Sequence, residues 1–385
     1  MGYTIQNGIL EGSDFERLTG SMNLSPTLLD NHLKLKINLK GMYSETSNTD
    51  AGAVIGNAIS MDPTKPVRAR HSEFYNKSYA GYWQWPIQVN RNDNEWRYGV
   101  NTLAPANPVS MVNLASDKGR SQRWMGNIEA TYQIHGLEDL SLHLNMGMDL
   151  GQGKSRRNKS PYYYDSGVYY YGNRGWNSMR TSNHTLSLYT QYMKQLDKNQ
   201  HIDAMVGYEW QHFHIRTDYF YSGRYPDSNL DEGLAGTLYN PSENTLYKSE
   251  NYLVSFFGRV NYSLMNRYLL TFTLRNDGSS RFNKGHRWGV FPSVALAWKM
   301  SEENFLKDWE ALDELKLRLG YGVTGQQEGI GDYTYFATYT PNSQGAYYPA
   351  IGEGITYRPA AYNKELTWEK TTTFNAGIDF SFFNN

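Results

Sequence analysis

Hydrophobic and polar residues alternate with a period of two along most of the chain. Between Leu33 and Lys40, every odd position is aliphatic and every even position is a lysine or an asparagine. A strand turns successive side chains to opposite faces, so this period predicts a β-strand with one apolar and one polar face. The same alternation recurs at residues 140–149, 202–211, 254–264, 315–322 and 373–382. The chain is therefore predicted to be all-β.

The predicted strands are long. We place them at roughly 2–10, 15–25, 32–46, 119–134, 138–153, 181–197, 200–217, 249–264, 267–282, 286–300, 312–324 and 366–383. Many run to about 15 residues, whereas a strand of a soluble domain averages about 5–6. A tilted strand needs only about 9–11 residues to cross the hydrocarbon of a membrane. These lengths favour an antiparallel transmembrane β-barrel.

The connections between the predicted strands alternate between short and long. The short ones lie at residues 26–31, 135–137, 198–199 and 265–266, and the long ones near 47–118, 154–180, 218–248 and 325–365. In an antiparallel meander, alternate connections emerge at opposite ends of the sheet. All the long connections should therefore lie at one end, as the extracellular loops of outer-membrane barrels do.

Composition narrows the possible functions. The 37 Lys+Arg residues nearly balance the 38 Asp+Glu residues, which argues against a nucleic-acid partner. Cysteine is absent, so no disulfide or thiolate metal site is possible. His212 and His214 share a strand face without a third metal ligand nearby, and no cofactor motif or catalytic constellation stands out. We therefore expect neither an enzyme nor a cofactor.

Several segments match one receptor family in the family's own order. They include residues 2–10, 12–17, 268–271, 275–282, 287–293, 315–318, 321–325, 363–371 and 375–380. The most recognisable is the polar run from Arg275 to Phe282. Together these segments resemble the SusC/RagA family of TonB-linked outer-membrane receptors.

The resemblance implies a larger protein than residues 1–385. Family members carry a signal peptide, a TonB-contacting segment, a plug and a barrel of about 22 strands. The chain would be a partial barrel domain of about 12 strands, with the signal peptide, plug and remaining strands absent. It would sit in the outer membrane of a Gram-negative, Bacteroidetes-type cell, in contact with its lipid.

The same resemblance implies a function and its partners. The chain would be the barrel portion of an active importer of oligosaccharides, or of peptides. A SusD-like surface lipoprotein would cover the extracellular cavity, and the TonB complex would act through the missing N-terminal part. The polar strand faces would line a hydrated interior; they carry Lys34, Lys36, Glu129, His143, Asp203, Glu209, Arg259, Lys316, Arg318 and Asp379.

Aromatic side chains gather in the long connections beside amides and charges. Flat rings stack on the apolar faces of sugars, while amides and carboxylates bind the hydroxyls. The predicted substrate contacts are Trp83, Trp85, Trp96, Tyr163, Tyr170 and Trp176. The alternative for these rings is that the loops pack on themselves around aromatic cores.

Two other functions fit parts of the pattern. A soluble all-β carbohydrate-binding module or carbohydrate-active enzyme would also alternate, because one face of each sheet would be core. It would not be expected to sort its loops by length to one end. A passive porin would share the barrel but would need no plug.

Overall fold

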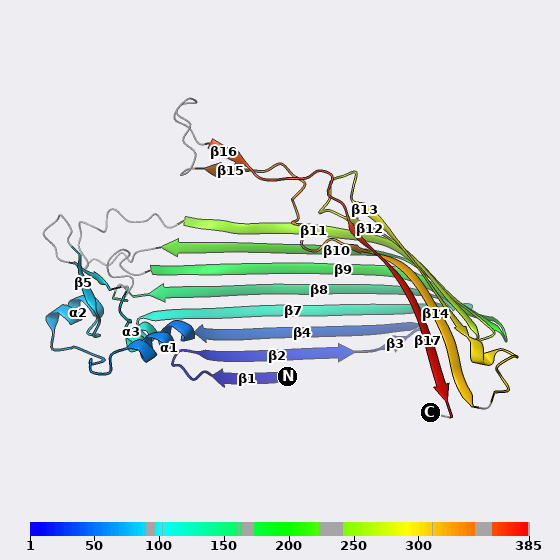
Figure 1. Ribbon diagram of the computed structural model, residues 1–385, viewed down its shortest axis with the longest axis horizontal. Helices are drawn as coiled ribbons and strands as arrows, with labels where there is room; N and C mark the ends of the chain where they lie inside the picture. The colour runs from blue at the N-terminus through cyan, green and yellow to red at the C-terminus, as the bar shows by residue number, and fades with distance from the viewer. Residues whose placement is uncertain are drawn as a thin grey trace.

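One antiparallel sheet makes up most of the molecule. The computed structural model describes residues 1–89, 97–101, 103–160, 162–163, 173–222, 242–309, 311–342 and 356–383. In this part of the chain, 13 strands form a sheet in the order β1-β2-β4-β7-β8-β9-β10-β11-β12-β13-β14-β17, with β3 paired to β4. Figure 1 shows it as a single curved layer that is open between β1 and β17. A sandwich of two facing sheets, the soluble alternative, is therefore wrong for the described strands.

The strands confirm the predicted pattern and extend it. They are β1 (Gly2–Asn7), β2 (Asp14–Leu24), β3 (Thr27–Leu28), β4 (Leu33–Asn48), β7 (Ala115–Ile134), β8 (Leu137–Lys159), β9 (Asn173–Asp197), β10 (Gln200–Ser222), β11 (Ser242–Leu264), β12 (Tyr268–Ser279), β13 (Trp288–Lys299), β14 (Leu312–Gln326) and β17 (Glu369–Phe382). At the short turns, the observed strand ends agree with the predicted limits to within a few residues. At the other end, β7 to β11 continue beyond the predicted limits by four to eight residues.

The short turns lie at one end of the sheet and the long excursions at the other. Gly136 adopts a left-handed conformation (φ 76°) in the tight turn between β7 and β8. A 3-10 helix at Met300–Glu302 lies in the connection between β13 and β14. The excursion between β4 and β7 carries α1 (Ala51–Ser60), α2 (Glu73–Tyr79), β5 (Pro86–Val89), β6 (Arg97–Val100) and α3 (Pro108–Asn113), at one end of the sheet in Figure 1. The excursion before β17 carries β15 (Tyr339–Asn342) and β16 (Thr356–Pro359).

The two faces of the sheet differ in chemistry. Large apolar side chains such as Leu142, Met146, Leu188 and Phe256 are exposed on one face. No helix in the described part of the chain is long and apolar enough to cross a membrane. The strand register places the predicted interior set, from Lys34 to Asp379, together on the opposite, polar face. The prediction of an apolar outer and a polar inner face is confirmed.

Candidate functional site

The β4–β7 excursion is a compact unit built around Asn107, of which 1% is exposed. The Asn107 amide nitrogen donates hydrogen bonds to the carbonyl oxygens of Val67 (2.8 Å) and Trp83 (3.0 Å). Its side-chain oxygen caps α3 by accepting from the Ser110 backbone nitrogen (3.2 Å). The Asn107 backbone nitrogen donates to the buried Gln84 side chain (2.8 Å). One asparagine therefore ties three stretches of the excursion together.

The predicted contacts Trp83 and Trp85 belong to a ring cluster on this unit. Their ring centroids lie 4.7 Å apart with the planes at 81°, and Tyr75 stacks on Trp83 at 6.4 Å. The Lys65 ammonium lies 5.6 Å from the Trp85 ring. Both tryptophans are half-buried, so part of each ring surface is accessible. Burial raises the pKa of the neighbouring Tyr79 to about 12 and keeps its hydroxyl protonated.

A cavity of about 990 Å³ lies where the polar face meets this excursion. Helices α1 and α3 form one side, and the excursion ends of β7 to β10 form the other. Asp117 and Arg157 face each other across β7 and β8 in an ion pair of 2.7 Å. Asn177 and Tyr219 occupy paired positions on β9 and β10 and complete a polar wall with a ring in it.

Asp117 has capacity for one more partner. Its Oδ2 atom accepts from the Arg157 Nε, whereas its Oδ1 atom is buried and has no hydrogen-bond partner among the described residues. A buried carboxylate oxygen is costly to leave unsatisfied. A hydroxyl or amide group of a bound molecule could donate to this oxygen from the cavity. The arrangement is suited to binding a neutral polar molecule and contains no acid–base pair for catalysis.

Two more predicted contacts lie in the cavity wall, in different settings. Tyr163 is 6% exposed and packs with Val54, Ala106 and Met111 in a small apolar core, with Lys159 over its ring at 4.6 Å. Trp176 stacks on Phe220 at 6.4 Å, with the Lys154 ammonium 4.5 Å from its ring. The register puts Trp176 on the same face of β9 as the exposed Leu188, so its ring points away from the interior.

The structure brings together only some of the six predicted contacts. Trp83 and Trp85 are neighbours, and Tyr163 and Trp176 border one cavity, but these two groups are separate clusters. Trp96 and Tyr170 lie outside the described residues. The cavity residues Asp117 and Arg157 are absent from the sequence-based set. Both residues continue the inward-facing, odd-numbered positions of β7 and β8. They lie beyond the predicted limits of these strands, so the alternation did not reach them.

The polar run from Arg275 to Phe282 supports the end of the sheet where the excursions lie. Arg275 donates to Asp277 (2.7 Å) and Ser255 (2.8 Å) and forms an ion pair with Glu209 (3.3 Å). These contacts tie β10, β11 and β12 together across the polar face. The run ends at Phe282, which is fully buried against Phe291 and Trp368.

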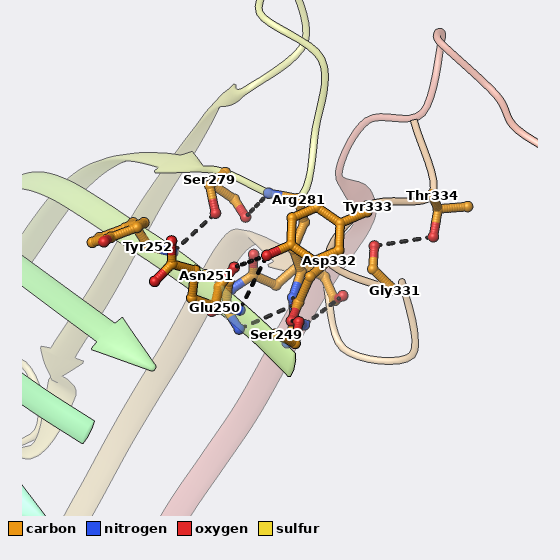
Figure 2. Close-up of polar contacts among 12 residues, drawn as sticks. Ser249, Glu250, Asn251, Tyr252, Ser279, Arg281, Gly331, Asp332, Tyr333 and Thr334 are labelled. Carbon is orange, nitrogen blue, oxygen red and sulfur yellow. Dashed lines mark hydrogen bonds and ion pairs between the residues drawn. The ribbon is translucent and has the colours of Figure 1, made fainter. Parts of the chain in front are cut away.

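Arg281 fixes a later loop to the same place, as Figure 2 shows. Its Nε atom lies 2.8 Å from the Asp332 carboxylate, which also accepts from the Ser249 hydroxyl and from the Asn251 amide (3.2 Å). The Tyr333 hydroxyl accepts from the Glu250 backbone nitrogen at 3.2 Å. The loop that follows β14 is therefore attached to the excursion end of β11. These contacts have a structural role, because Arg281 and Asp332 already pair with each other.

A family model described as the TonB-dependent receptor-like β-barrel matches residues 68–385. The chain belongs to this receptor family. It is 45% identical, over its whole length, to the TonB-dependent receptor SusC of Bacteroides thetaiotaomicron. It is also 28% identical to the TonB-dependent receptor P26 of Formosa agariphila, again over its whole length. The predicted SusC/RagA resemblance is confirmed, and the chain is an outer-membrane β-barrel protein.

A solved structure has the same fold over the whole length of this chain. The receptor barrel superposes on a chain of the RagAB peptide transporter with a TM-score of 0.71, over all of this chain and 40% of the other, at 21% identity. The chain spans 38% of the length of SusC and 36% of the length of P26. The open sheet therefore corresponds to part of a larger barrel in these relatives.

Proposed function

We propose that residues 1–385 form part of the wall and extracellular loops of a TonB-dependent importer. In this function the chain binds nothing covalently and catalyses no reaction. A substrate is captured in the cavity between the excursions and the polar face. Energy supplied through the TonB complex then displaces a plug and opens the interior. A SusD-like lipoprotein covers the excursion end during capture.

The cavity at the excursion end is the observation on which this proposal rests. It lies over the polar face, which carries charges of both signs and suits a hydrated passage. Its volume of about 990 Å³ is at the upper end of the range for small-molecule sites and leaves room for a short oligomer. A passive porin would have no need of a binding site at its entrance, so the cavity favours a receptor.

We propose an oligosaccharide as the substrate, with a short peptide as the second candidate. The Asp117 carboxylate, the Asn177 amide and the Tyr219 ring combine hydroxyl-binding groups with a flat surface. Trp83 and Trp85 add half-buried rings elsewhere on the same excursion. This mixture suits sugars, whose hydroxyls need donors and acceptors and whose ring faces need apolar platforms. The peptide alternative would use the same ion pair to bind its backbone and termini.

The test is a matched pair of carboxylate variants in the complete receptor with its lipoprotein. Asp117→Asn alters the cavity, whereas Asp149→Asn alters a second Asp–Arg pair (2.6 Å, with Arg123) farther along the same polar face. Binding to panels of glycans and peptides is measured by calorimetry. We expect Asp117→Asn to weaken binding of the preferred glycan by about tenfold, since a charged hydrogen bond contributes about 1.5–3 kcal/mol. Asp149→Asn should leave binding unchanged.

Two results would count against the proposal. Equal losses in the two variants would mean that the effect is structural and that the cavity is not the binding site. Binding of peptides alone would replace the oligosaccharide with the second candidate. Trp83→Ala adds a separate check on the ring cluster, where a loss of glycan binding is expected.

A further inference from the structure

The outer face of the sheet carries a group of cations above its apolar band. We define the outer basic patch as five of these cations that have no acidic partner among the described residues: Lys118 on β7, Lys154 and Arg156 on β8, Arg180 on β9 and Lys248 on β11. All five are exposed. The register places them on the same face as the lipid-facing Leu142, Met146 and Leu188, not on the face of the interior.

The patch lies at a defined distance from the apolar band. On β7 the outward residues become apolar at Trp124, on β8 at Leu150 and on β9 at Leu186. The cations lie four to six residues nearer the excursions, about 13–20 Å along the strand. Because barrel strands tilt, their height above the hydrocarbon is smaller than this distance. At a tilt of about 35–45°, the cations lie about 9–16 Å above the first apolar residues, in the polar region at the outer surface of the membrane.

Like charges face one another within this region. Lys118 pairs with Arg156 in the register of β7 and β8. Arg216 lies between Arg180 and Lys248 in one row across β9, β10 and β11. Like charges at directly opposed strand positions destabilise a sheet. Two neighbouring cations on this face are partly neutralised, because Arg120 pairs with Glu45 (3.0 Å) and Arg216 with Asp218 (2.9 Å). The five patch cations have no such counter-charge in the part of the chain that the structure describes.

We infer that the outer basic patch binds the phosphate groups of the glycolipid in the outer leaflet of the membrane. The ligand is an anionic headgroup whose acyl chains lie against the apolar band below. Guanidinium and ammonium groups on adjacent strands, about 5 Å apart, can bind one phosphate from two sides. The phosphate supplies the counter-charge that the like-charged pairs require. This inference needs only the position of the barrel in the outer membrane and does not depend on import.

The test uses the receptor folded in detergent and titrated with phosphorylated lipid A or with the same lipid after enzymatic dephosphorylation. Native mass spectrometry counts the lipid retained. For the wild-type protein, we expect binding that requires the phosphates and weakens as salt is added. The triple variant Lys154→Gln, Arg156→Gln, Arg180→Gln should lose at least about tenfold in affinity, since each cation contributes about 1 kcal/mol at an anionic surface.

The matched control removes the same charge from the interior. Lys34→Gln, Lys36→Gln, Lys40→Gln changes three cations on the polar face of β4, and its lipid binding should equal that of the wild type. Arg156→Gln alone provides a milder variant, with an expected loss of about fivefold. Equal binding of the phosphorylated and dephosphorylated lipids would overturn the inference, and so would equal losses in the two triple variants. It would also be overturned if the outer triple variant changed only the oligomeric state, which would assign the patch to a second protein copy.

Discussion

Phe291 occupies space that two glycines leave open. Its ring lies over Gly325 on β14 and over Gly289 on its own strand, and a Cβ atom at either glycine would overlap the ring. The ring also packs edge-on against Trp368 at 5.3 Å, while Phe282 lies on the other side of the same cluster. It is one of two buried apolar clusters among the described residues, most of whose large apolar side chains are exposed. Its packing should therefore be sensitive to a single methyl group.

Gly325→Ala is expected to destabilise the folded receptor by about 1–3 kcal/mol, the usual cost of overpacking a close-packed site. The added methyl group must displace the Phe291 ring from the cluster. The measurement is the unfolding midpoint in denaturant, followed by tryptophan fluorescence. Gly320→Ala in the same strand is the control, because its nearest neighbour would be the Asn375 Cβ atom at 3.7 Å. Equal midpoints for the two variants would show that the ring moves aside freely.

At the scale of the element, the period-two pattern predicted every long strand. It underestimated the lengths of β7 to β11 and overestimated those of β12, β13 and β17 by a few residues. β9 contains 25 residues, of which the pattern indicated only those from 181 onward. The missed part, residues 173–180, has polar residues on both faces, such as Arg180 on the outer face and Asn177 on the inner face, and shows no regular alternation. Alternation appears only where one face contacts lipid, and it disappears where water reaches both faces. The same effect concealed Asp117 and Arg157, because strand ends without an apolar face look like loops.

The internal structure of the β4–β7 excursion could not be predicted from sequence for a different reason. Its three helices have 10, 7 and 6 residues, too few for a strong helical period. Its shape depends on long-range bonds from buried amides, which local patterns do not encode. The sequence shows where aromatic residues are concentrated. It does not show that some form a ring cluster, one belongs to an apolar core and another lies on the outward face, because these settings depend on the three-dimensional structure.

Asn107→Asp is expected to loosen this excursion while the strands stay intact. Aspartate can still cap α3, but it cannot donate to the carbonyl oxygens of Val67 and Trp83. Leaving these buried acceptors unpaired should cost at least about 2 kcal/mol of local stability. Limited proteolysis should then cut within residues 61–89 more rapidly than in the wild type. Asn101→Ala removes a single local bond (3.0 Å, from Leu103) and should not change the cleavage rate.

At the scale of the whole molecule, the sheet has two free edges. The described residues of β1 pair only with β2, and those of β17 only with β14. Unpaired backbone groups cannot be accommodated in hydrocarbon, where no water is present to bind them. The fold class could be predicted from the sequence because strand length and loop sorting are properties of the whole chain. Closure of the barrel could not, since it depends on strands that pair with these edges.

Residues 1–385 presented alone to lipid vesicles are therefore expected to aggregate or remain at the surface. The physical reason is the cost of the two open edges, at several kcal/mol for each unsatisfied group in hydrocarbon. The measurement is protection of the strands from protease after refolding with vesicles. The complete receptor, refolded in the same way, should be protected. A protected monomer of residues 1–385 would contradict this prediction and would mean that the edges can meet each other.

The height of the wall has a consequence for what reaches the cavity first. Fully extended, the 25 residues of β9 span about 80 Å, whereas the hydrocarbon of a bilayer is about 30 Å thick. Even when tilted, the strand raises the entrance tens of ångströms over the cell surface. A molecule longer than the cavity can thus enter by one end while the rest of it stays in the surrounding medium, well above the membrane surface.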